Sequence, residues 1–238
     1  MKKIFIIFIL CVSTFYANTH IDNAKIAKEA YLNGEYKKAF TLYEVLIKNG
    51  IVESNYYLGN MYYLGEGVEK DYNKALELFK IASNKGIMEA TNNLGLMYVN
   101  GHGVKKDYKK AFELFNIAAD NSELCLSYSN IGYAYSLGLG INKDYTKAIE
   151  YYTIACKNKC YDSCLAVGEY YERGISVDKN YTAAKKYYTQ ACNAGVTGAC
   201  NDMKNLKKPK TILDNFWIYL FSIFLIAGIL YWERKNKI

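Results

Sequence analysis

The stretch that decides the fold is LGNMYYLGEGVEKDYNKALELFKIA, residues 58–82. Its pattern returns three more times at spacings of 36, 37 and 36 residues, and the glycines of the Leu-Gly-like pairs are Gly59, Gly95, Gly132 and Gly168. A tyrosine follows each glycine three positions later, and a Gly-x-Gly turn comes next, although the fourth turn is degenerate and has Ser176 in place of its second glycine. Self-similarity at a period of this length is typical of repeat architectures.

Each part of the repeat has a physical purpose. Leu58 and Gly59 lie four and three residues before Tyr62, so the three share one face of a helix. The glycine turn lets the chain reverse, and Asp71 stands where a carboxylate can cap a second helix. Because one helix pair cannot bury its own apolar face, the pairs must stack on one another. The sequence therefore predicts an all-α fold, an α-solenoid of helix pairs.

The composition excludes two classes of protein. Of the 238 residues, 51% are hydrophobic and 16% aromatic, which is too much apolar mass for a disordered chain. The formal net charge of +7 could indicate nucleic-acid binding, but nine of the basic residues lie near the two ends, within 2–3, 204–210 and 234–237. Without them the middle of the chain is near neutral, so we expect no nucleic acid as a partner.

The repeats resemble the SEL-like repeats (SLR), a branch of the tetratricopeptide superfamily whose units look like Leu-Gly-x-x-Tyr, Gly-x-Gly-Val, Asp-Tyr-x-Lys-Ala and Ala-Ala. The resemblance implies a right-handed solenoid. It places the four units at residues 51–86, 87–122, 123–159 and 160–195. Residues 18–50 resemble a plain tetratricopeptide hairpin that forms an N-terminal cap, and residues 196–215 form a partial repeat and a linker.

Both ends of the chain predict a membrane. Residues 1–17 have two lysines, an apolar run and then small and polar residues, the order of a signal peptide; cleavage after Ala17 and an uncleaved anchor both stay open. Residues 216–232 carry no charge and have aromatic residues near each end, which predicts a transmembrane helix followed by a cytoplasmic tail, 233–238. We therefore expect an inner-membrane anchor with the repeats in the periplasm.

The cysteines predict disulfides. Cys156 and Cys164, and likewise Cys192 and Cys200, stand eight residues apart across the turn between two units, where thiols on facing helices can meet. The spacing is similar to that of the cysteine-rich Helicobacter-type SLR proteins, in which such pairs are disulfides, and export permits oxidation. Cys125 and Cys160 fall in turns between units and have no partner at that spacing, so they bridge neighbouring turns or stay free.

The first helices of such arrays line a concave surface, and the tetratricopeptide analogy indicates which side chains it exposes. They lie three residues before, one after, and four and five after each repeat glycine: Tyr56, Asn60, Tyr63, Asn92, Asn100, Tyr133, Glu169, Glu172 and Arg173. Tyrosine and asparagine suit contact with a peptide or a glycan. We expect a scaffold that binds an envelope protein or peptide, without a metal or a cofactor.

The alternative is a β-lactam hydrolase. Hydrolysis or binding of β-lactams has been assigned to some cysteine-rich SLR proteins, so the resemblance implies a β-lactam or a peptidoglycan fragment as a ligand. One Ser-x-x-Lys sequence exists, from Ser176 to Lys179, but the companion Ser-Asp-Asn and Lys-Thr-Gly motifs are missing. With only His20 and His102 as histidines, no catalytic triad can be assembled. The sequence favours a scaffold over an enzyme.

Overall fold

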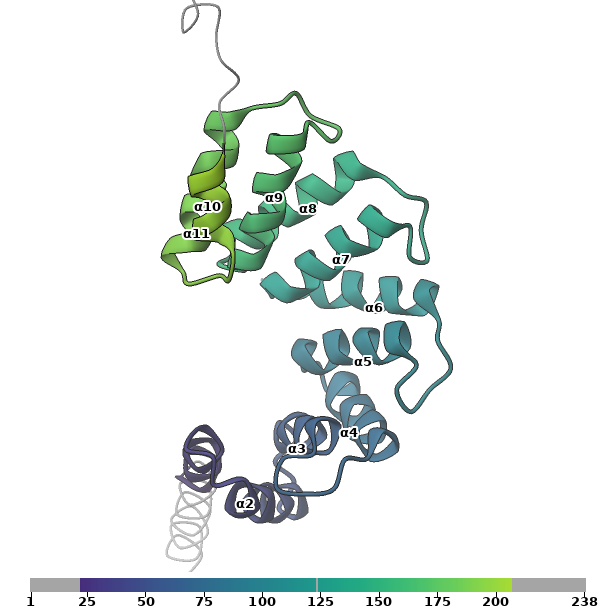
Figure 1. The fold of residues 1–238 in the computed structure, drawn as a ribbon. Coiled ribbons are helices and arrows are strands. Elements are labelled where there is room, and N and C mark those ends of the chain that lie inside the picture. Colours follow the sequence, from purple (N-terminus) through teal and green to yellow (C-terminus); the bar gives the residue numbers. More distant parts are fainter. Residues whose placement is uncertain (1–21, 123, 207–238) are drawn as a thin grey trace, which may run out of the picture.

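A computed structural model describes residues 22–122 and 124–206. All of their regular structure is helical, and Figure 1 shows the helices stacked in chain order along a curved array. An initial helical segment covers residues 22–32. The labelled helices are α2 (Tyr36–Lys48), α3 (Ser54–Leu64), α4 (Tyr72–Asn84), α5 (Met88–Asn100), α6 (Tyr108–Asp120), α7 (Cys125–Leu137), α8 (Tyr145–Lys157), α9 (Tyr161–Arg173), α10 (Tyr181–Asn193) and α11 (Ala199–Asn205).

The helices pair as the repeat predicts. Helices α3 and α4, α5 and α6, α7 and α8, and α9 and α10 form the four pairs, and each pair also packs on its neighbours in the chain. The prediction of an all-helical repeat solenoid is confirmed, whereas the segment boundaries drawn from the sequence remain predictions.

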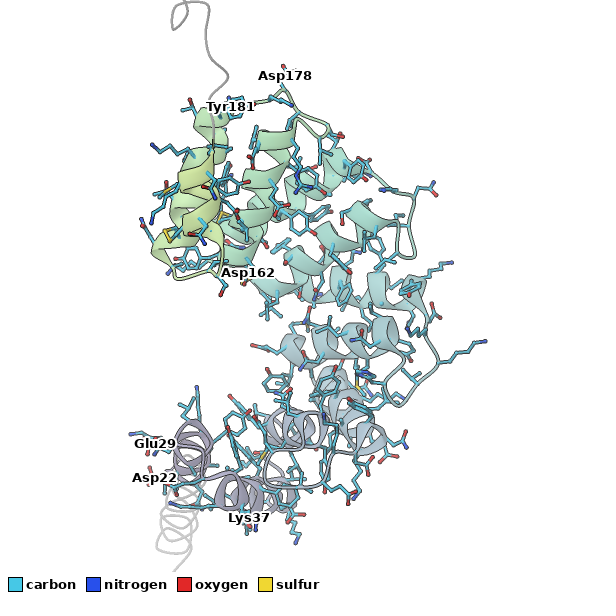
Figure 2. The ribbon with its side chains drawn as sticks, viewed as in Figure 1. Asp22, Glu29, Lys37, Asp162, Asp178 and Tyr181 are labelled. Carbon is cyan, nitrogen blue, oxygen red and sulfur yellow. A yellow bond between two sulfur atoms is a disulfide. The ribbon has the colours of Figure 1, made fainter. Side chains whose placement is uncertain are left out.

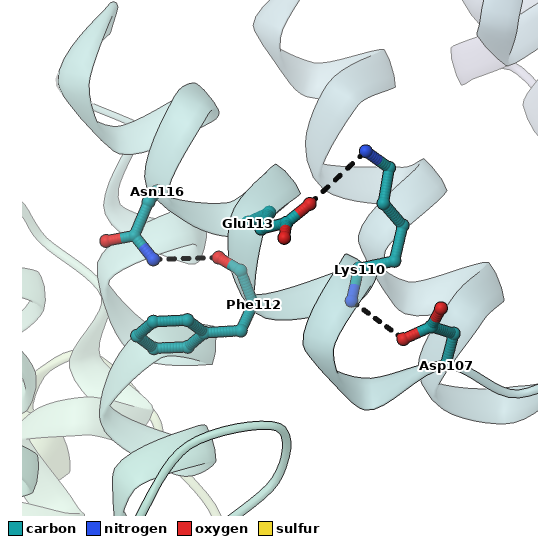
Figure 3. Close-up of polar contacts among 5 residues, drawn as sticks. All are labelled: Asp107, Lys110, Phe112, Glu113 and Asn116. Carbon is teal, nitrogen blue, oxygen red and sulfur yellow. Dashed lines mark hydrogen bonds and ion pairs between the residues drawn. The ribbon is translucent and has the colours of Figure 1, made fainter.

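The second helix of each pair begins at a side-chain cap. In the second unit Asp107 accepts a hydrogen bond from the backbone N–H of Lys110 at 2.9 Å, and the Lys110 side chain reaches Glu113 at 3.3 Å (Figure 3). The equivalent caps are Asp71, Asp144 and Asn180. Each cap satisfies an amide that would otherwise lack a partner at the helix start, and it fixes where the second helix begins.

Two glycines in each of the first three units permit close packing between helices, and the fourth unit has the first of them, Gly168, with Ser176 in place of the second. Gly95 lies in α5 against the ring of Phe115 in α6, and a Cβ added to it would be 2.5 Å from Cε1 of Phe115. Gly103 has a φ of +67°, and a Cβ there would be 2.6 Å from the carbonyl oxygen of Tyr72 in the preceding unit. The first glycine thus joins the two helices of a unit, and the second joins consecutive units.

Three disulfides tie the C-terminal half together. Cys156 in α8 pairs with Cys164 in α9, and Cys192 in α10 pairs with Cys200 in α11. The question left open for the other two cysteines is answered, because Cys125 pairs with Cys160, with their Cα atoms 5.6 Å apart. Disulfides of this number indicate an oxidising, exported compartment.

The predicted fold class is wrong in one respect. It included a C-terminal transmembrane helix, but within residues 22–122 and 124–206 no helix is long and apolar enough to cross a membrane. The reason is the repeat itself, since its turns end each labelled helix after at most 13 residues, whereas a crossing takes about 20 apolar residues. The segments predicted as signal peptide, 1–17, transmembrane helix, 216–232, and tail, 233–238, lie outside the described residues.

Candidate functional site

The first helices α3, α5, α7 and α9 form one face of the array, which we call the first-helix face. It is almost free of charge over three of its four helices. Helices α3 and α7 contain no charged residue, and α5 contains only Glu89, at its start. The charges gather in α9, where Arg173 lies 3.8 Å from Glu169. A surface of this kind offers shape, apolar area and amide groups to a partner, and little net charge.

Two cavities of about 180 Å³ each open on this face, and we call them the first and second slots. The first slot is lined by Asn60, Tyr63, Leu64, Phe79, Asn93 and Leu96. The second slot is lined by Leu96, Val99, Asn100, Tyr108, Ala111, Phe112, Phe115, Asn130, Tyr133, Ala134 and Leu139. Each lies between two successive first helices and reaches a phenylalanine of the second helix below.

The repeat generates the two slots. Phe79 and Phe115, at equivalent positions of α4 and α6, lie against the repeat glycines Gly59 and Gly95. Because those glycines have no side chain, the rings can lie close to the first helices. Leu96 belongs to both slots and forms the wall between them.

Four of the predicted residues line the slots. Asn60 and Tyr63 belong to the first slot, and Asn100 and Tyr133 to the second. Tyr133 is 49% exposed. The Tyr63 hydroxyl lies 3.0 Å from Nδ1 of His102, whose ring stacks on Tyr72 at 4.2 Å, so the Tyr63 ring is held in place from the neighbouring loop.

Two predicted residues hold helices together instead. Asn92 is only 1% exposed, and its side-chain oxygen accepts hydrogen bonds from Asn130 at 2.8 Å and Ser127 at 3.3 Å. Its placement on the exposed surface is therefore corrected, because it is buried between α5 and α7. Tyr56 is half-buried, with its ring 6.3 Å from that of Phe79. The pKa of Tyr56 is raised because burial disfavours its charged form.

The three predicted residues of α9 are separate from the slots. Glu172 accepts a hydrogen bond from the Tyr188 hydroxyl at 2.6 Å. Burial and this bond raise the pKa of Tyr188 above its ordinary range, because both disfavour the tyrosinate. Glu169 faces Arg173 in an exposed pair, which contributes little to stability. Glu172 thus forms its hydrogen bond with α10. Helix α9 is the charged end of the first-helix face.

Sequence reasoning missed the slot residues Asn93 and Asn130. Both stand two positions before a repeat glycine, so the repeat itself contained the signal. Asn93 donates to Asn60 at 2.9 Å, and Asn130 donates to Asn92. These bonds join successive first helices and fix the amides at the slots.

The Ser-x-x-Lys sequence forms no catalytic arrangement with the slots. Ser176 has a φ of +55° in the exposed turn before α10. Figure 2 shows Asp178 of the same turn at the far edge of the array. Neither Ser176 nor Lys179 lines a slot or the wider hollow of about 710 Å³ beside α10 and α11. Among residues 22–122 and 124–206, no three His, Cys, Asp or Glu side chains gather as a metal site.

The comparisons with known proteins concern the repeats. The family model described as Sel1 repeat matches residues 52–87, 89–123, 126–160 and 162–196, more than half of the chain. No curated protein matches the chain.

Two solved structures show the same repeat fold, and a third is similar to part of the chain. The Sel1 repeat protein from Oxalobacter formigenes is 26% identical over 84% of this chain and 86% of that one, with a TM-score of 0.71. The protective antigen c5321 of uropathogenic Escherichia coli, which displays an SLR fold, is 28% identical over 80% of this chain, with a TM-score of 0.69, and the match spans 42% of its length. The cysteine rich protein B of Helicobacter pylori is 29% identical over 56% of this chain and 94% of that one, with a TM-score of 0.44.

Proposed function

The chain belongs to the Sel1 repeat family, and from this premise we propose that it is an exported scaffold that binds a partner protein at the bacterial cell envelope through its first-helix face. Sel1 repeats generally mediate protein–protein interaction. The observation that carries the proposal for this chain is the pair of neighbouring slots on one nearly uncharged face.

The size of the slots supports a protein partner over a small substrate. Sites for drug-sized ligands usually measure about 300–1,000 Å³. Each slot holds about 180 Å³, close to a cavity of about 150 Å³ that takes a single benzene ring. A slot of this size suits one side chain, and two slots in a row suit a chain that carries several.

The disulfides support the cellular compartment proposed for the protein. Three disulfides within residues 125–200 require an oxidising compartment to form and persist, and the bacterial periplasm is one. A scaffold in that compartment meets envelope proteins, which are the class of partner that we propose.

The proposal is tested by capture of the partner from cross-linked envelopes with the full-length chain as bait. Tyr133→Ala should reduce capture about 30-fold, because an aromatic anchor at an interface commonly contributes about 2 kcal/mol or more. Lys80→Ala is the matched control, since Lys80 is exposed on the second helix α4 and should leave capture unchanged. Equal capture by the wild type and Tyr133→Ala would contradict binding through the first-helix face.

A further inference from the structure

We infer that the hollow of about 710 Å³ beside α10 and α11 binds an acidic segment of another protein, with the carboxylates of that segment against three lysines. We call it the C-terminal hollow. Figure 1 shows α10 and α11 side by side at the end of the array. The inference goes beyond the proposed function, because the C-terminal hollow shares no lining residue with the two slots.

The lining of the C-terminal hollow is positively charged. Lys185 and Lys186 come from α10 and Lys204 from α11, and no Asp or Glu is among the residues that line it. All three lysines are exposed, and none forms an ion pair with an Asp or Glu of residues 22–122 and 124–206. Like charges around one hollow repel each other until an anion neutralises them. The charge therefore selects an anionic occupant.

Two of these lysines replace residues that pack the repeats together. Lys204 stands 36 residues after Gly168, at the place of the repeat glycine. Lys185 stands five residues after the cap Asn180, where the other second helices have an apolar residue that packs in the core: Leu76, Phe112 and Ile149. A further repeat packed here would bury Lys185 without a partner of opposite charge. A second copy of the same end would bring lysines against lysines, so neither fits.

The position of the hollow indicates a polypeptide. In the inner units the first residue of the second helix lies under a turn of the next unit. Gly103 lies against the carbonyl oxygen of Tyr72 in α4, and Gly140 lies likewise on Tyr108 in α6. Tyr181 is the equivalent residue of α10, but it lines the hollow, and no glycine of residues 22–122 and 124–206 packs on it. The hollow is thus a surface on which the other units receive a segment of chain.

The size of the hollow also favours a segment over a small ion. A single inorganic anion would fill little of about 710 Å³, whereas a segment with several carboxylates can reach lysines on both helices. The chain itself does not supply that charge. Residues 207–238 contain six Lys or Arg and only two acidic residues, and residues 1–21 contain two lysines and no acidic residue. The acidic segment therefore belongs to another protein.

The test measures binding of rhodamine-labelled ten-residue peptides to the purified full-length chain by fluorescence anisotropy. One peptide carries four Asp and Glu residues in a Gly and Ser background. The second has Asn and Gln in their places, so it keeps the shape and loses the charge. We expect the acidic peptide to bind at least tenfold more tightly, because only its carboxylates neutralise the lysines.

Variants with equal changes of charge locate the binding. Lys185→Gln with Lys186→Gln should weaken binding of the acidic peptide about tenfold, because each exposed ion pair contributes up to about fivefold in affinity. Lys204→Gln, on the other helix, should weaken it about threefold. The matched control is Lys105→Gln with Lys106→Gln, two neighbouring exposed lysines before α6 that do not line the hollow. Its affinity should stay within twofold of the wild type.

Equal affinity for the acidic and the amide peptide would overturn the inference, and so would equal losses in the two double variants, which would indicate attraction by net charge alone. A third contrary result is binding of phosphatidylglycerol vesicles that Lys185→Gln with Lys186→Gln abolishes, without binding of the acidic peptide. The hollow would then recognise a lipid surface. The proposed function is tested separately by Tyr133→Ala, so it stands or falls independently of these results.

Discussion

Reduction should destabilise the C-terminal half of the array by several kcal/mol and leave the N-terminal half unchanged. All six paired cysteines lie within residues 125–200, and residues 22–122 contain none. By loop-closure entropy, each pair that is eight residues apart contributes about 2–3 kcal/mol, and the Cys125–Cys160 pair, which is 35 apart, about 4 kcal/mol. In a repeat array stability is a sum of local terms, so the loss stays local.

Hydrogen exchange followed by mass spectrometry, with and without dithiothreitol, measures this difference. Amides in α7 to α11 should exchange faster after reduction, while amides in α3 to α5 keep their protection. The double variant Cys125→Ser with Cys160→Ser is the specific control, since it retains both eight-residue links and should accelerate exchange mainly where α7 and α9 begin. If reduction accelerated amide exchange equally along the whole chain, the prediction that the disulfides stabilise only the C-terminal half would be contradicted.

The second large effect concerns a glycine that permits helix contact. Gly95→Val should lower the free energy of unfolding by about 3 kcal/mol, because the added side chain overlaps the ring of Phe115 and outweighs the small gain in helix propensity. Urea denaturation measures the change. The control is Gly86→Ala, at a position with nothing within 4 Å, and it should cost about 1 kcal/mol from its positive φ alone.

A double-mutant cycle separates the overlap from other causes. Phe115→Leu removes part of the ring that the side chain added by Gly95→Val would meet, so the double variant should be less destabilised than the sum of the two single changes. Strict additivity would mean that Gly95 matters for some reason other than contact with Phe115.

The repeat period made most of the fold predictable. The first helices end at glycines, Gly65, Gly101, Gly138 and Gly174, and the second helices begin at the Asp and Asn caps, and both signals are local in sequence. The direction of Asn92 was harder to predict, because successive side chains of an α-helix point about 100° apart around its axis. Asn92, three before its glycine, therefore faces the next first helix, while Asn93, two before it, faces the first slot.

The third disulfide needed the fold as well as the spacing. Cys125 and Cys160 are 35 residues apart, which is almost one repeat. Both therefore stand at the beginning of a first helix, one in each of two consecutive units, and stacking brings the two beginnings together. This separation of nearly one period pointed to a pairing of the two cysteines. Whether they form a disulfide or stay free thiols depends on how closely consecutive units pack, and the sequence does not give that distance.

The most direct test of a protein-binding first-helix face is photo-crosslinking in intact cells. A photoreactive phenylalanine replaces Tyr133 on the first-helix face in one strain and Lys80 on α4 in another. Our account predicts a discrete polypeptide adduct from position 133 that Leu64→Arg abolishes, and no such adduct from position 80. Adducts from position 80 alone, or identical adducts from both positions, would contradict it.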